Sequence, residues 1–348
     1  IKVSAKAFET RTKPTTLKSD ANRGVLVIGH DRGGLSVESV RKFAKELGWP
    51  IIAEDPLTFA DAVAHASIFL TSAQIRAALI PQTVIVIGRT TLSRSINTFL
   101  RLAPTQIVID PRMATVDSDR HADKRFTQIP ELNTKTASPE WSEQWEKYAD
   151  RAAKSIDALT GFSEAVIARE VAANLPEGST LFVSSSRPIR DLEGFGAPRS
   201  GVRTHANRGL AGIDGNISTA LGIASASKQT FAVLGDLSFL HDLTGLIHRE
   251  DIDCCFIVIN NDGGGIFSTL PQRGVDGFES VFGTPHGLDP AAIAGAMGIS
   301  ASTISSIDEL KKVLKSPVKG ISVVVANVAS RDENADSLKA IYESMNSI

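Results

Sequence analysis

The sequence predicts an α/β protein with two parallel-sheet domains, each built of three layers. Short apolar runs alternate with stretches of helical spacing along most of the 348 residues, as in residues 24–47 and 231–259. These runs are apolar throughout, which is typical of parallel strands that helices cover on both faces. The chain is longer than one ordinary sheet domain, so we expect two domains.

The composition is that of an ordinary folded protein, with 42% hydrophobic residues, 22% charged residues and a net charge of −2. So small a net charge gives no argument for a nucleic-acid or anionic-membrane partner. No run of about 18 apolar residues predicts a membrane span. Cys254 and Cys255 are adjacent in an apolar run, so we expect buried thiols on opposite faces of a strand. The sequence shows no signal peptide, and we expect a cytoplasmic protein.

The first sheet domain is expected over residues 21–135, after a polar and rather basic linker at residues 1–20 that leads in from a preceding domain. Its expected strands are 24–28, 50–53, 83–87 and 106–109, and its expected helices are 36–47, 59–69 and 93–102. The opening segment VLVIGHDRGG lacks the glycine spacing of a dinucleotide-binding turn, so we expect no nicotinamide cofactor there.

A connecting helix is expected over residues 136–160, because Ser138 suits the N-cap and Pro139 the first turn. Trp141 and Trp145 lie on one side of this helix and are expected to pack between the domains. The second domain is expected over residues 161–348. Its expected helices include 163–174, 217–226 and 336–344. Its expected strands include 180–184 and 321–326, of which the second closes the sheet, and a glycine-rich loop is expected over 192–204.

Residues 231–270 read as strand, helix and strand, with a polar turn after each strand. In parallel sheets, ligands bind beyond the carboxyl ends of neighbouring strands. Asp236 follows the first strand and Asn261 the second, and Gly263 allows its backbone carbonyl to approach a ligand closely. These three oxygen donors predict a Mg²⁺ site that a phosphate group completes. The alternative is that both segments are ordinary turns.

Positively charged side chains follow other strands of the same domain. Ser186 and Arg190 lie in the segment SSSRPIR, and Arg208 lies in the segment NRG. Arginine binds carboxylates through two parallel hydrogen bonds, so such a cluster suits a substrate with several carboxyl groups. The alternative is that these arginines are solvated surface residues.

Three segments resemble the thiamine diphosphate enzymes, whose signature is GD followed by NN some two dozen residues later. They are GDLSFLHDLTGL, INNDGGGIFSTLP and ANRGLAGIDGNISTALGIA. Together they are similar to the menaquinone-pathway family of 2-succinyl-5-enolpyruvyl-6-hydroxy-3-cyclohexene-1-carboxylate synthases. The resemblance implies that the first sheet domain is the middle domain of that family and that the second binds thiamine diphosphate. The implied metal is Mg²⁺ or Mn²⁺.

The resemblance also implies roles for individual residues. The implied metal ligands are Asp236, Asn261 and Gly263. The implied cofactor-binding residues are Gly212, Ile213, Gly235, Asp236, Leu237, Ser238, Asn261, Gly263 and Gly264, with Ile213 beneath the bent cofactor. The implied substrate-binding residues are Ser186, Arg190, Arg208, Ile266, Phe267 and Arg94.

By the same resemblance, the substrates are 2-oxoglutarate, which is decarboxylated, and isochorismate, which accepts the four-carbon unit by conjugate addition. The full-length enzyme is expected to be a homodimer or homotetramer. The family's ylide-promoting glutamate lies in a pyrimidine-binding domain that residues 1–20 are too short to form. We therefore expect this chain to contain no catalytic glutamate of that kind and to be inactive alone.

Two other functions remain open at this stage. One is another thiamine diphosphate enzyme of the acetolactate synthase or 2-oxoacid decarboxylase type, against which the arginine cluster argues. The other is a non-catalytic assembly module with a nucleotide-binding type of fold. Metal-dependent binding of thiamine diphosphate separates the module from both enzymes.

Overall fold

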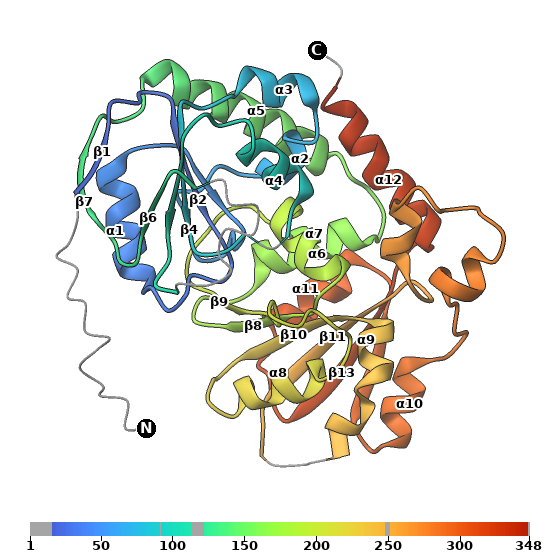
Figure 1. The fold of residues 1–348 in the computed structure, drawn as a ribbon. Coiled ribbons are helices and arrows are strands. Elements are labelled where there is room, and N and C mark those ends of the chain that lie inside the picture. The colour runs from blue at the N-terminus through green and yellow to red at the C-terminus, as the bar shows by residue number, and fades with distance from the viewer. Residues whose placement is uncertain (1–15, 91, 113–121, 248–250, 347–348) are drawn as a thin grey trace, which may run out of the picture.

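The computed structural model describes residues 16–90, 92–112, 122–247 and 251–346. Two parallel sheets lie one beside the other, and helices cover both faces of each (Figure 1). Separate apolar clusters fill the space on the two faces of each sheet. The predicted α/β class with two three-layer domains is confirmed.

The first sheet has the strand order β3-β2-β4-β5-β6, with every pair parallel. Its strands are β2 (Gly24–Ile28), β3 (Ile51–Ala53), β4 (Thr83–Ile87), β5 (Gln106–Ile109) and β6 (Lys124–Phe126). The helices around it are α1 (Val37–Leu47), α2 (Ala66–Phe69), α3 (Ala73–Ala78) and α4 (Arg94–Leu100). The side chains of β2 and β4 are buried on both faces, as their unbroken apolar sequences predict.

A separate pair of parallel strands, β1 (Thr16–Ser19) and β7 (Glu131–Thr134), lies beside this domain. Leu17 of β1 is fully buried in the core around α1. Residues 16–19 are therefore part of the folded domain, although the sequence predicts a linker over residues 1–20; residues 1–15 lie outside the described chain.

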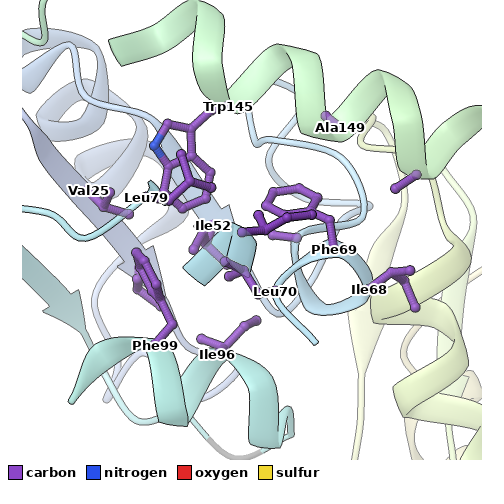
Figure 2. Close-up of a cluster of buried hydrophobic side chains, with 14 of the residues drawn as sticks. Val25, Ile52, Ile68, Phe69, Leu70, Leu79, Ile96, Phe99, Trp145 and Ala149 are labelled. Carbon is purple, nitrogen blue, oxygen red and sulfur yellow. The ribbon is translucent and has the colours of Figure 1, made fainter. Parts of the chain in front are cut away.

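Helix α5 (Pro139–Asp157) joins the two domains, and its Ser138 N-cap accepts a hydrogen bond from the Trp141 backbone N–H. Figure 2 shows Trp145 reaching from α5 into a cluster that includes Phe69 and Phe99. The ring centroids lie 5.8 Å and 5.5 Å from that of Trp145, in edge-to-face arrangements. The tryptophans are packing residues, as predicted.

The second sheet has the order β12-β13-β11-β10-β8-β9, again with every pair parallel. Its strands are β8 (Thr180–Val183), β9 (Arg203–His205), β10 (Thr230–Gly235), β11 (Cys254–Asn260), β12 (Ser300–Ile304) and β13 (Ile321–Asn327). Its helices are α6 (Glu164–Asn174), α7 (Arg187–Phe195), α8 (Asn216–Ala224), α9 (Asp236–His241), α10 (Pro290–Ala296), α11 (Ile307–Lys315) and α12 (Arg331–Ser344). The short turns are η2 (Leu243–Ile247), η3 (Gly265–Thr269) and the π-helical η4 (Glu279–Gly283).

Helix α12 packs against the connecting helix α5 and against α2 of the first domain (Figure 1). Cys254 and Cys255 are free, buried thiols, and they lie in the apolar clusters on opposite faces of the second sheet. Within the described residues, every helix is too short or too polar to cross a bilayer.

Three local predictions are wrong. Of the helix expected over 59–69, only the last four residues form a helix, α2. Before it the chain turns, because the Asp55 carboxylate accepts hydrogen bonds from the Leu57 N–H and the Thr58 hydroxyl. The loop expected over 192–204 begins with the end of α7 and ends in β9. The single helix expected between the two strands of residues 231–270 is instead two short elements, the α-helix α9 and the 3₁₀ helix η2, and Ile247 at the end of η2 is 64% exposed.

Candidate functional site

Asp236 is the first residue of α9 and follows β10 directly. The residue is buried, with 2% of its surface exposed. One carboxylate oxygen accepts the Leu237 N–H at 2.7 Å, and the other accepts the Gly263 N–H at 2.9 Å. His286 Nε2 lies 3.2 Å from that second oxygen. Burial raises the pKa of Asp236, and these hydrogen bonds oppose the rise.

Asn261 follows β11, and its turn lies next to Asp236 because β10 and β11 pair in parallel register up to Gly235 and Ile259. The amide nitrogen of Asn261 donates a hydrogen bond to Glu164, the first residue of α6. The amide oxygen is buried and has no hydrogen-bond partner within the described residues. Such an atom requires a partner that the chain itself does not supply.

Gly263 and Gly264 form the turn between β11 and η3. Gly263 has a φ of 131°, and a Cβ there would come within 2.2 Å of the Gly283 carbonyl oxygen. A Cβ on Gly264 would come equally close, 2.2 Å, to the Phe282 carbonyl oxygen. Only glycine fits at either position, and the turn is fixed next to Asp236.

The other predicted cofactor-binding residues lie in two places, at the start of α9 and in the segment before α8. Ser238 is buried on α9, and a Cβ on Gly235 would meet no atom within 4 Å, so the space beside Asp236 is open. Gly212 and Ile213 precede α8, and their carbonyl oxygens accept hydrogen bonds from the Asn216 side chain at 3.3 Å and 2.8 Å. Ile213 is 39% exposed.

A cavity of about 350 Å³ lies between the two domains. It brings together four of the predicted substrate-binding residues, which are Arg94, Arg190, Ile266 and Phe267. Arg94 begins α4 of the first domain, whereas Arg190 comes from α7 of the second. Burial, followed by the neighbouring Arg187, lowers the pKa of Arg190. Both domains are therefore needed to form this cavity.

Ser186 and Arg208 do not line this cavity. Ser186 has a φ of 74°, unusual for a residue other than glycine, and its carbonyl accepts a hydrogen bond from Arg190 at 2.6 Å. Arg208 lines a second, more open cavity of about 820 Å³ and lies 3.3 Å from the Ser185 hydroxyl. The charge of Arg190 nevertheless contributes, after burial, to the lowered pKa of Arg208.

Several polar residues at the site are missing from the sequence prediction. Arg187, Asp191, Glu193 and Tyr342 line the cavity between the domains. Arg187 forms an ion pair with Asp191 and lies 3.6 Å from Glu164. Burial raises the pKa of Asp191 to about 7 and that of Glu193 well above its ordinary value. Arg187 could have been predicted, because it lies in the segment SSSRPIR between Ser186 and Arg190. No sequence motif marks the buried carboxylates.

A cation at this site would need amide and backbone oxygens in addition to the Asp236 carboxylate. Within residues 16–90, 92–112, 122–247 and 251–346, no group of three or more histidine, cysteine, aspartate or glutamate side chains is placed to hold a metal ion. Asp236 with the unpartnered amide oxygen of Asn261 is a donor set that suits a hard cation such as Mg²⁺.

Comparisons with known proteins bear on both domains. Residues 2–183 match the family described as "Middle domain of thiamine pyrophosphate", and residues 195–328 match "Thiamine pyrophosphate enzyme, C-terminal TPP binding domain".

The chain is also similar to curated proteins named 2-succinyl-5-enolpyruvyl-6-hydroxy-3-cyclohexene-1-carboxylate synthase. The protein from Thermobifida fusca is 37% identical over 84% of this chain and 55% of its own length. Those from Bacillus cytotoxicus and Lysinibacillus sphaericus are each 31% identical, over 93% and 95% of this chain and 60% and 62% of their own lengths. The chain thus spans 55–62% of the length of these relatives. The chain belongs to the 2-succinyl-5-enolpyruvyl-6-hydroxy-3-cyclohexene-1-carboxylate synthase family of thiamine diphosphate enzymes.

Proposed function

We propose that this chain supplies the metal- and diphosphate-binding part of a thiamine diphosphate-dependent transferase. The metal, Mg²⁺ or Mn²⁺, is held by Asp236, by the Asn261 amide oxygen and by the Gly263 carbonyl. The buried, unpartnered Asn261 oxygen is the observation that carries this assignment. Cofactor contacts come from Gly212, Ile213, Gly235, Leu237, Ser238 and Gly264.

The proposed reaction is the decarboxylation of 2-oxoglutarate followed by conjugate addition of the four-carbon unit to isochorismate. The name of the relatives gives a succinyl-substituted cyclohexene carboxylate as the product, which supports this proposal. Thiamine diphosphate, when bound, supplies an electron sink for this chemistry. Arg94 and Arg190 bind substrate carboxylates, while Ile266 and Phe267 supply an apolar wall that excludes water. The cavity that these four residues line between the domains supports this proposal. Ser186 and Arg208 are proposed to bind substrate beside it.

The proposed assembly is a homodimer or homotetramer in the cytoplasm. Two exposed apolar side chains in the segment before α8 support an assembly, since Leu210 is 94% exposed and Ile213 is 39% exposed. That this chain alone gives no turnover stays a prediction, and carbon dioxide release from 2-oxoglutarate with thiamine diphosphate and Mg²⁺ tests it.

Calorimetric titration of the chain with thiamine diphosphate tests the proposed function. We expect binding with Mg²⁺ present and little binding with EDTA. No binding in either condition would favour the non-catalytic assembly module. If the cofactor binds, a second titration compares 2-oxoglutarate with pyruvate. A preference for pyruvate would favour an enzyme of the acetolactate synthase or decarboxylase type.

A further inference from the structure

The side-chain amide of Asn261 is oriented by a carboxylate on another element. Its nitrogen donates a hydrogen bond to Glu164, and its oxygen is buried without a partner within the described chain. A carboxylate only accepts hydrogen bonds, so the amide nitrogen must face Glu164. If the amide were flipped, its oxygen would face the Glu164 carboxylate, and two hydrogen-bond acceptors would repel each other. Glu164 thereby determines which atom of Asn261 faces the proposed metal site.

Glu164 is itself held independently of Asn261. It is the first residue of α6, where Ser163 is the N-cap and accepts the Val166 N–H. The Glu164 backbone N–H donates to the Asn334 side chain of α12 at 3.0 Å. On the other side, the Arg187 guanidinium lies 3.6 Å from the Glu164 carboxylate. The acceptor that Asn261 meets is therefore fixed by two helices and a buried cation.

The hydrogen-bonded side chains of Asn261 and Glu164 leave no room for a side chain at Gly265. A Cβ on Gly265 would lie 2.4 Å from the Asn261 amide nitrogen and 3.3 Å from the nearer Glu164 oxygen. The first distance is shorter than real Cβ contacts, so a side chain at residue 265 would displace the Asn261 amide from its present position. The absence of a side chain at Gly265 is thus a second, independent condition for the observed orientation.

We propose that Glu164 is a positioning residue that turns the oxygen of Asn261 toward the proposed diphosphate-binding metal ion. The inference rests on the proposed function, because it needs a cation at Asp236 and Asn261. Partners that orient a metal ligand typically change metal affinity by about 10–100-fold when they are removed. Glu164 contributes through the geometry of Asn261 and does not touch the ion.

The test uses the full chain with Mn²⁺ as the probe and thiamine diphosphate present, and free Mn²⁺ is measured by electron paramagnetic resonance. We expect Glu164→Ala and Glu164→Gln each to weaken Mn²⁺ binding, by about 10–100-fold for alanine. The decisive comparison repeats Glu164→Gln in an Asn261→Asp background. There the glutamine amide can donate to the new carboxylate, so Glu164→Gln is expected to strengthen binding. A merely structural role would give the same sign in both backgrounds and would overturn the proposal.

Gly265→Ala provides a second test, with Gly222→Ala as its control, because a Cβ on Gly222 meets no atom within 4 Å. We expect weaker Mn²⁺ binding only for Gly265→Ala, and thermal unfolding checks that each variant folds. If the unaltered chain binds Mn²⁺ and no variant at Glu164 or Gly265 changes the affinity, the inference fails while the proposed function stands. If the unaltered chain binds no Mn²⁺, both fail.

Discussion

The backbone N–H of Gly263 donates a hydrogen bond to the Asp236 carboxylate at 2.9 Å, which ties the turn after β11 to the end of β10. The two residues lie far apart in the sequence, and the parallel pairing of β10 with β11 brings them together. This bond fixes the turn whose carbonyl is the proposed third metal ligand. Changes at either residue should therefore alter metal binding.

Asp236→Asn should remove most metal-dependent cofactor binding while leaving the fold intact. The amide oxygen of the variant can accept only one of the two backbone N–H groups, those of Leu237 and Gly263, that the carboxylate accepts, and the only formal negative charge among the proposed ligands is lost. We expect the affinity for thiamine diphosphate in the presence of Mg²⁺ to fall more than about tenfold. Calorimetry measures this, and Asp308→Asn, an exposed change on α11, is the matched control. Equal affinities for the two variants would contradict the assignment.

Gly263→Ala should disrupt the turn, because its Cβ would come within 2.2 Å of the Gly283 carbonyl oxygen. Gly274→Ala is the control, since Gly274 also has a positive φ, 83°, but no atom within 4 Å of an added Cβ. The control should be destabilised only by the strain of an alanine at positive φ, which lowers the free energy of unfolding by about 1–2 kcal/mol. We expect a loss of metal-dependent cofactor binding for Gly263→Ala alone. Similar binding by both variants would show that the turn is not needed.

Arg190→Ala should weaken the binding of a dicarboxylate substrate by about 2–3 kcal/mol, the usual size of a hydrogen bond between charged groups. Cofactor affinity should hardly change, because Arg190 lines the cavity between the domains and lies outside the turn at Asp236. Titration with 2-oxoglutarate measures the loss. Lys339→Ala removes a positive charge from the exposed face of α12 and serves as the control. If both variants bind 2-oxoglutarate equally, Arg190 is a solvated charge.

Much of the fold follows from the sequence because the central strands are unbroken apolar runs. β4 and β5 begin and end at the residues predicted for them. The strands that the prediction misses lie at sheet edges, where one side has no neighbouring strand. β6, β9 and β12 have the sequences KRF, RTH and SASTI, and most of their side chains are exposed or only partly buried. Edge strands need no apolar run, so periodicity does not reveal them.

The site is predictable only in part, for a related reason. Asp236 and Asn261 follow consecutive strands of one βαβ unit, and parallel pairing requires those strand ends to be neighbours. Glu164 and His286 lie outside this βαβ unit and contact Asn261 and Asp236 only in the folded chain. Their contacts depend on how α6 and the loop before α10 pack, which local sequence patterns do not encode.

His65 should make the stability of the chain depend on pH. Its Nδ1 lies 2.8 Å from the Gly194 carbonyl oxygen of α7, so it joins the first domain to the second. Burial lowers the pKa of His65 below its ordinary value of 6.5. As the pH falls below 6.5, His65 binds a proton in the unfolded chain before it does so in the folded chain. The free energy of unfolding should therefore fall as the pH falls from 6.5 toward the lower pKa of the folded chain.

His65→Asn should remove this contribution, and asparagine tolerates the positive φ of 59° at this position. Urea unfolding of the unaltered chain and of the variant between about pH 7.5 and pH 5 measures the effect. Other buried groups, including His205, whose pKa burial also lowers, contribute to both curves and cancel in the difference. We expect the variant to lose less stability than the unaltered chain as the pH falls. Parallel curves would mean that His65 accepts its proton equally well in the folded and unfolded chains.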